Sequence, residues 1–223
     1  RAHHADGAEG DVIAHWPFDT GQEAVDASGN GHDLRLRGQS RFVPDGREGS
    51  CLESHPAHSG NDVEVGAMVA NSPALTPEGA FTIELWLKPK PEFASQAQMT
   101  LLDKMYISSA TPRERANRDY QIRVSRVGDY SVEFRALLGF DEDSLGFSSG
   151  ECELSPDRWD YLAFTYDGAG TGRFYFNREP VGRRSYPGRG SIVAGPFGLA
   201  IGDRYGSTHM GTPAYFDDVR IAE

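Results

Sequence analysis

The fold is decided by the stretch WDYLAFTYDG at residues 159–168, which RFYFN at 173–177 closely follows. Read with a period of two, the odd-numbered residues from Trp159 to Thr165 share one strand face, and the even-numbered residues from Leu162 to Tyr166 share the other. Both faces carry apolar side chains, so this strand is expected in the middle of a sheet. The glycine-rich turn between the two stretches predicts that they form a hairpin.

The composition extends this prediction to the whole chain. The 223 residues include 26 glycines and 13 prolines, and no long segment has the 3.6-residue period of a helix. Many short strands joined by tight turns are therefore expected, as in an all-β, two-sheet antiparallel β-sandwich. We predict one domain over residues 11–223, preceded by a linker or flexible end at residues 1–10, which are small and polar.

The charge balance narrows the possible partners. Lys and Arg number 22 against 33 Asp and Glu, which gives a formal net charge of -11. This argues against binding to nucleic acid, which requires cations at the phosphates. An acidic surface suits calcium, neutral glycans and protein partners better. No apolar run is long enough to predict a membrane span, and residues 1–10 lack the apolar core of a signal peptide.

The two cysteines, Cys51 and Cys152, allow two interpretations. They can be buried free thiols, since unpaired cysteine behaves as a small apolar residue. A disulfide closing a loop of roughly 100 residues would instead stabilise the fold by about 4 to 5 kcal/mol. We expect the disulfide, because an even number of cysteines in a glycine-rich, exported domain favours pairing.

Three further strands bear on the site. FTIELWLKP at 81–89 alternates fully, and its odd-numbered residues are predicted to face the core. The strand at 12–19 contains Pro17, which lacks a ladder N–H, so we expect this strand at a sheet border. In the last strand, 215–221, Asp217 is predicted on the core face, where a carboxylate needs a partner.

The remaining strands are short. They are predicted at 34–36, 41–43, 51–53, 62–65, 99–104, 120–124, 130–135, 191–193 and 199–202, with a helical turn at 72–75. Loops are predicted at 89–98, 108–119, 141–143 and 203–214.

Five motifs in order resemble a known family. They are HWPFD at 15–19, DASGNGHD at 26–33, FTIELWLKP at 81–89, WDYLAFTYDG at 159–168 and FDDVRI at 216–221. Together they are similar to the laminin G-like jelly-roll domains of the concanavalin A-like lectin and glucanase superfamily. The resemblance implies two antiparallel sheets in a jelly roll, in many members a calcium ion near the start and end of the domain, and a place within a larger exported or surface protein.

A calcium site is predicted where those two ends meet. Calcium takes six to eight oxygen ligands, mixing carboxylates with carbonyls. Asp19, Asp26, Asn30 and Asp217 are the candidate ligands, because the first and last strands of a jelly roll are commonly neighbours and the resemblance supports this placement. The alternative is that these side chains bind backbone amides or form Asx turns without metal.

The sequence argues against catalysis. Retaining glycosidases carry two carboxylates about 5 to 5.5 Å apart, so Glu-x-Asp in a strand would be the signature. Glu84 lies on a suitable strand, but Trp86 stands where the second carboxylate should be. The carboxylates at 141–143 and 151–153 are interpreted as solvated loop charge. No phosphate loop, nucleophile elbow or zinc spacing is present.

Carbohydrate binding is the favoured activity. Sugar rings present C–H faces to aromatic side chains, while their hydroxyls require polar partners. The candidate ligand-binding residues are Trp86, Phe140, Asp141, Tyr205 and His209; ordinary packing or surface exposure is the alternative for each.

We therefore expect a non-catalytic recognition module for a polysaccharide or glycoconjugate, in a periplasmic, cell-surface or extracellular protein. A protein-adhesion or spacer module is the first alternative. A glycoside hydrolase or lyase of the same superfamily is the second.

Overall fold

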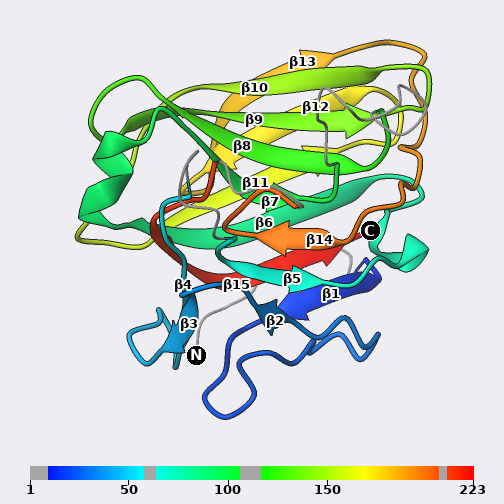
Figure 1. The fold of residues 1–223 in the computed structure, drawn as a ribbon. Helices are drawn as coiled ribbons and strands as arrows, with labels where there is room; N and C mark the ends of the chain where they lie inside the picture. Colours follow the sequence, from blue (N-terminus) through cyan, green and yellow to red (C-terminus); the bar gives the residue numbers. More distant parts are fainter. Residues whose placement is uncertain (1–9, 58–63, 106–116, 206–209) are drawn as a thin grey trace.

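The computed structural model describes residues 10–57, 64–105, 117–205 and 210–223, and folds them into two stacked antiparallel β-sheets (Figure 1). We call them sheet A and sheet B. In spatial order, sheet A contains β13 (Glu179–Ser185), β12 (Thr171–Phe176), β11 (Asp160–Tyr166), β6 (Phe81–Pro89), β15 (Ala214–Ala222), β4 (Cys51–Glu53) and β3 (Arg41–Val43), with β1 (Val12–Trp16) paired to β15. Sheet B contains β10 (Ser144–Glu153), β9 (Ser131–Gly139), β8 (Tyr120–Arg126), β7 (Gln98–Asp103), β14 (Leu199–Ile201), β5 (Ala67–Val69) and β2 (Arg35–Leu36). The predicted all-β sandwich is confirmed.

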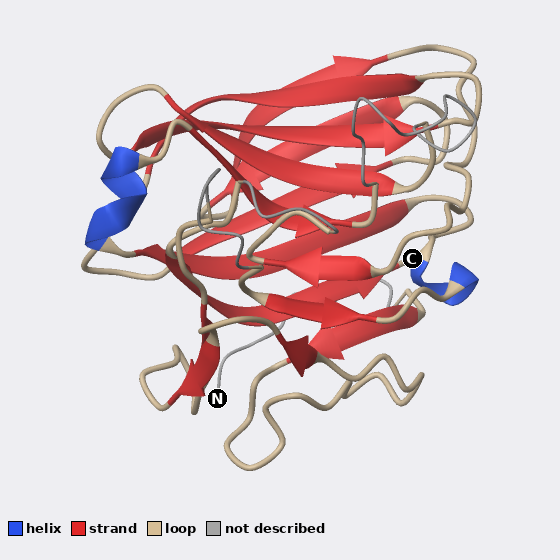
Figure 2. Ribbon diagram, in the orientation of Figure 1, coloured by secondary structure: helices blue, strands red, loops and turns tan. Residues whose placement is uncertain are grey.

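Helix is confined to two short 3-10 turns among the described residues (Figure 2). The first, η1 (Pro73–Leu75), confirms the predicted helical turn, and Ser72 caps it by accepting a hydrogen bond from the amide of Ala74. The second, η2 (Pro91–Ser95), lies in a segment predicted as loop. Neither turn is long or apolar enough to cross a membrane.

The central strand lies where its two apolar faces predict. β11 pairs with β12 on one side and with β6 on the other. In β6 the odd-numbered residues from Phe81 to Pro89 are buried, and the even-numbered residues between them are half-buried. The inner face of sheet A therefore packs against sheet B. Phe164 of β11 there contacts Phe174 of sheet A and Phe147 of sheet B, with ring centroids 4.9 and 5.7 Å apart.

The first and last strands are neighbours, as predicted. β1 pairs antiparallel with β15, Val12 opposite Ala222 and Trp16 opposite Val219. Beyond the pair, the amide of Glu223 donates to the carbonyl of Asp11 at 3.0 Å. β1 has one neighbouring strand, which confirms its predicted place at a sheet border.

Several predicted elements differ from the structure. β10 and β13 were not predicted as strands, whereas residues 191–193 form no strand. The strand predicted at 62–65 lies partly outside the described residues, and the pairing strand is β5, a few residues later.

The predicted disulfide is wrong. Cys51 and Cys152 are both buried free thiols. Cys152 belongs to the core cluster between the sheets. Cys51 lies on β4, where the negative charge of Asp217 contributes to raising its pKa, and Asp217 lies on the outer side of sheet A. The two sulfur atoms thus occupy opposite sides of sheet A. Burial raises the pKa of the Cys51 thiol to about 12, so it stays protonated.

Candidate functional site

Four aromatic side chains gather on the outer side of sheet A. Trp86 comes from β6, Tyr161 from β11, Tyr215 from β15, and Trp159 directly precedes β11. Tyr161 lies opposite Trp86 in the ladder, with ring centroids 5.2 Å apart, and Tyr215 lies opposite Lys88. All four rings are half-buried, so each keeps an accessible part. We call this set the aromatic face.

Cations are interleaved with these rings. The Arg47 guanidinium lies 4.2 Å from the centroid of Trp86. The ammonium of Lys88 lies 5.3 Å from the ring of Trp159 and 5.2 Å from that of Tyr215. Each distance is within the range of a cation–π contact, so ring quadrupoles stabilise these charges.

A carboxylate completes the aromatic face. Glu84 of β6 accepts hydrogen bonds from the hydroxyl of Tyr161 and, at 3.2 Å, from Nη1 of Arg220. Burial and this neighbouring carboxylate raise the pKa of Tyr161, so the phenol remains a hydrogen-bond donor. The face thus presents rings, donors and an acceptor together.

Two of the predicted ligand-binding residues, Phe140 and Asp141, lie at the β9–β10 turn. Phe140 packs on Tyr166, with centroids 6.1 Å apart, and the Arg189 guanidinium lies 5.6 Å from its ring. Asp141 is held by an ion pair with Arg118. Both predicted residues are thus engaged with the protein itself.

The third group lies beside sheet B. Tyr205 packs on Phe197, with centroids 6.0 Å apart, and its amide donates to Oδ2 of Asp103 at 2.9 Å. His209 lies outside the described residues. The structure therefore does not bring Tyr205 together with Trp86, because Trp86 lies on β6 of sheet A whereas Tyr205 follows β14 of sheet B.

The predicted calcium ligands at the first loop bind the backbone. Oδ1 of Asp26 accepts from the amides of His15 and Ser28, and Oδ2 accepts from the amide of His32, each at 3.0 Å. These amides lower the pKa of Asp26 against the opposing effect of burial. Asn30 donates its side-chain amide to the carbonyls of Val12 and Ile13, both at 2.9 Å.

Asp217 is also bound to backbone, but on the side opposite to the one predicted. A bulge at Asp218, whose φ is 48°, shifts the register of β15, so Phe216 faces the core and Asp217 lies opposite Trp86. There it accepts from the amides of Arg47 at 2.6 Å and Asp218 at 2.8 Å. Burial raises its pKa to about 6.

These contacts do not fit a calcium site. Asp19 is exposed at the end of the first strand, and the Asp26 and Asp217 oxygens point at N–H donors rather than at a shared centre. In the described part of the chain, no three His, Cys, Asp or Glu residues are grouped to hold a metal ion. The alternative of amide binding thus describes Asp26 and Asp217, and calcium stays a prediction.

The aromatic partners of Trp86 were not predicted as site residues. The alternation in 159–168 did place Trp159 and Tyr161 on one face. Which β6 residue lies beside them depends on the cross-strand register, and that register is set by long connections that the sequence pattern does not measure.

The fold and the aromatic face together define the class of protein. Two stacked antiparallel sheets, with the first and last strands paired in one of them, form a concanavalin A-like β-sandwich. Residues 61–223 match the family profile Laminin_G_3, described as "Concanavalin A-like lectin/glucanases superfamily". The chain belongs to this family. No curated protein matches its sequence.

Solved structures share the fold. The chain is similar to the binding domain of Paraclostridial Mosquitocidal Protein 1, with a TM-score of 0.68 and 14% identity over 95% of this chain and 48% of that one. It is also similar to the binding domain of botulinum neurotoxin DC in complexes with SialylT, at 13% identity, and with rat synaptotagmin II, at 14%. Both have TM-scores of 0.64 and the same coverage. The chain spans about half the length of these structures, and at such identities the likeness shows the fold alone.

Proposed function

We propose that this chain is a non-catalytic carbohydrate-recognition module that binds a polysaccharide or glycoconjugate on the aromatic face of sheet A. The observation that carries the proposal is the gathering of Trp86, Trp159, Tyr161 and Tyr215 on one side of one sheet, each half-buried. Trp86, Tyr161 and Tyr215 stand on paired strands, which hold these rings in place before any ligand arrives.

The chemistry of the face suits a sugar. An aromatic ring can cover the C–H side of a pyranose, while its hydroxyls need donors and acceptors close by. Glu84 offers an acceptor, and Lys88 and Arg220 offer donors. Aromatic side chains on neighbouring strands can contact successive sugar units.

The described surface favours a glycan over a protein partner. Its exposed large hydrophobic residues are Val25, Leu36 and Val127, which lie in a loop, in β2 and in the β8–β9 turn. Scattered single residues are normal on a surface and do not form the apolar patch that an adhesion module would present. Related folds bind both kinds of partner, SialylT in one neurotoxin structure and synaptotagmin in another.

The carboxylates of the aromatic face argue against catalysis. Asp217 has a raised pKa, but its oxygens accept the backbone amides of Arg47 and Asp218. A retaining glycosidase needs one carboxyl group that stays protonated as the acid. Glu84 binds Arg220 and Tyr161, while Asp218 binds His15 at 2.6 Å. The His15 hydrogen bond lowers the pKa of Asp218, which keeps this carboxylate ionised and unsuited to the role of acid.

The wider setting is proposed from the family resemblance. The module is one part of a larger exported or surface protein, and it displays the aromatic face to glycans outside the cell.

The test is a glycan screen followed by titration of any ligand found. We expect Trp86→Ala to weaken binding by about tenfold or more, because an aromatic contact and its ligand surface are lost together. Tyr205→Ala is the matched control, an aromatic truncation on the other sheet, and should bind like wild type. Melting temperatures verify that both variants are folded.

Two results would oppose the proposal. If wild-type binding never exceeded background in the screen, the proposal that the chain binds carbohydrate would be contradicted. Equal binding by wild type and Trp86→Ala would move the site away from the aromatic face.

A further inference from the structure

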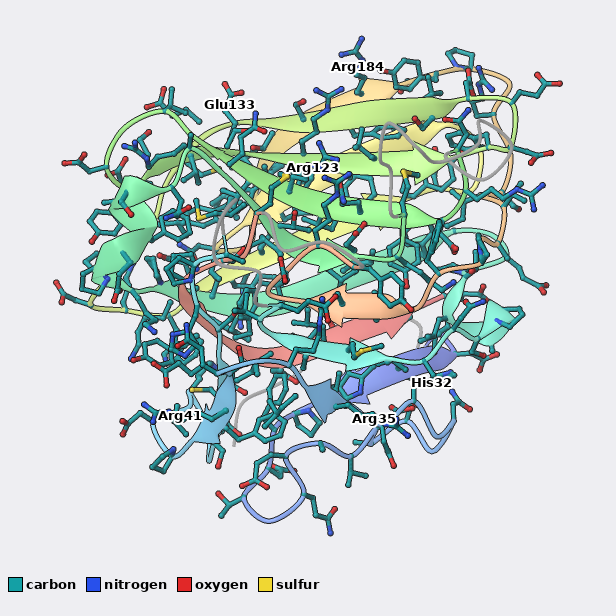
Figure 3. The ribbon with its side chains drawn as sticks, in the orientation of Figure 1. His32, Arg35, Arg41, Arg123, Glu133 and Arg184 are labelled. Carbon is teal, nitrogen blue, oxygen red and sulfur yellow. The ribbon has the colours of Figure 1, made fainter. Side chains whose placement is uncertain are left out.

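The outer side of sheet B carries an unusual pair of like charges. Arg123 of β8 and Arg135 of β9 lie directly opposite each other in the ladder, and Arg123 is near the centre of the sheet in Figure 3. Side chains at directly opposed positions are neighbours, and like charges there destabilise the sheet. The chain as a whole has more acidic than basic residues, so this pairing is not a consequence of its composition.

Arg123 is held in place by a chain of buried groups. Its Nε donates to Oε1 of Gln121, whose Nε2 donates to Oδ1 of Asp103 at 2.6 Å. Asp103 is anchored in turn by the amides of Met105 at 3.1 Å and Tyr205 at 2.9 Å. Gln121 and Asp103 are fully buried. The guanidinium of the half-buried Arg123 is thus oriented through its Nε.

A third arginine lies beside this pair. Arg204 directly precedes Tyr205, whose amide binds Asp103, so the segment runs along the same side of sheet B. Burial and the positive charges of Arg204 and Arg135 lower the pKa of Arg123, and Asp103 opposes them only in part. Arg204 and Arg135 are therefore both close enough to Arg123 to act on its charge.

Arg135 lies flat on the neighbouring strand. A Cβ atom at Gly146 of β10 would come within 2.6 Å of its Nη2 and 2.8 Å of its Nε. Glycine at this position thus gives the exposed guanidinium room against the sheet. In the part of the chain that the structure describes, no carboxylate lies within ion-pair distance of Arg123 or Arg135.

We propose that Arg123 and Arg135, with Arg204 beside them, form a second binding site, which takes the carboxylate or sulfate group of an acidic sugar. Guanidinium groups bind such oxyanions through short, charge-assisted hydrogen bonds, often two at a time. An oxyanion between the two side chains would relieve their repulsion. The site lies on the sheet opposite the aromatic face and does not depend on it.

The net charge favours a ligand with one acidic group rather than many. A polyanion would be repelled by a chain of formal charge -11, whereas a single oxyanion among neutral hydroxyls meets chiefly the local arginines. That the oxyanion is carried by a sugar rests on the proposed function; the arginine site itself does not.

The experiment is an NMR titration at low salt with four probes: sodium glucuronate, glucose, sodium sulfate and heparin. We expect glucuronate to shift the signals of β8 and β9 while glucose does not. Arg135→Gln should weaken glucuronate binding by about tenfold or more, since a charge-assisted contact is lost. Without ligand, its melting temperature should equal or exceed that of wild type, because the cross-strand repulsion is gone.

Two controls separate this site from other effects. Arg35→Gln removes an exposed arginine from β2 of the same sheet and should change neither binding nor melting temperature (Figure 3). Trp86→Ala should bind glucuronate like wild type, so failure of the aromatic face and failure of this site are distinguishable.

Three outcomes would overturn the inference. Unchanged glucuronate binding by both Arg123→Gln and Arg135→Gln would show that there is no arginine site. If sulfate bound as tightly as glucuronate, the arginine site would be a site for a free anion and would not recognise the sugar. Heparin that binds more tightly than glucuronate, and more weakly to Arg35→Gln, would indicate general polyelectrolyte attraction.

Discussion

The outer faces of the two sheets follow the same alternation of apolar and polar residues, yet their cations have different neighbours. On sheet A, Lys88 lies between two aromatic rings and Arg220 binds Glu84. On sheet B, Arg123 faces Arg135. Alternation decides which side of a sheet a residue faces, but the cross-strand register decides what it meets there.

The faces also differ in what lies beneath their charges. Glu84, Lys88 and Arg220 of sheet A are half-buried, whereas Asp103, Gln121, Lys104 and Asp119 of the sheet B side are fully buried. On sheet B, buried Gln121 and Asp103 hold Arg123, and Lys104 and Asp119 form a separate buried pair. Such networks rigidify a site when every member has a partner.

The largest effect is expected from breaking the buried Lys104–Asp119 pair. The Lys104 ammonium binds Asp119 at 3.0 Å, and neither side chain is exposed. Asp119→Ala leaves the ammonium buried without its carboxylate and should lower the free energy of unfolding by about 3 to 5 kcal/mol. On sheet A, Arg220→Gln breaks a partly exposed pair and should lower it by about 1 kcal/mol or less. Urea unfolding measures both, and equal losses would contradict the contrast.

An intermediate effect is expected on the pH dependence of stability. Asp203, after β14, accepts from the amides of Val65 and Arg204, and burial raises its pKa to about 7. The folded state therefore holds this proton at pH values where the unfolded state has lost it. Between pH 4 and 7 stability should fall as pH rises, by up to about 1.4 kcal/mol per unit from this group. Asp203→Asn should remove that slope in urea unfolding at several pH values.

Sheet A offers the control of opposite sign. The His15 hydrogen bond lowers the pKa of Asp218, so its contribution is present above the ordinary Asp pKa and lost as pH falls through the lowered value. Asp218→Asn should thus cost stability near neutral pH and cost nothing in strong acid. If the contributions of Asp203 and Asp218 to stability changed with pH in the same direction, both assignments would be refuted.

The smallest effect is expected from a chelator. The Asp26 and Asp217 oxygens already accept backbone amides, so we expect excess EDTA to shift the melting temperature by less than about 1 °C. Added calcium should also leave the melting temperature unchanged within about 1 °C. A fall of several degrees with EDTA that calcium reverses would instead establish the metal site that the sequence predicts.

The strands that the sequence predicts well are those whose pattern is purely local. β6 and β11 alternate over their full length, so period and burial agree. β10 and β13 were missed because they are rich in glycine, serine and charged residues, and tertiary contacts alone make them strands. Gly146 lies against the Arg135 side chain of another strand, which leaves no room for a Cβ atom, and no local sequence pattern shows this contact.

Site residues depend on registers that local pattern does not fix. The bulge at Asp218 moved Asp217 from its predicted face to the opposite one, because one extra residue reverses the alternation. The sequence predicted the β8–β9 hairpin from its Gly128-Asp129 turn, but it did not predict which residues of the two strands lie opposite each other. A two-residue turn there would place Arg123 opposite Phe134, and only the longer turn that the structure contains places it opposite Arg135.

The pairing of β1 with β15 also sets how the sandwich responds to tension. Val12, where the sandwich begins, lies opposite Ala222, where it ends, so a pull through both flanks acts on the same rung of the ladder. Force applied this way opens one rung after another, like a zipper, instead of loading all of them at once in shear. We therefore expect a pull on both flanks to detach β1 first, while the other strands of the two sheets remain paired.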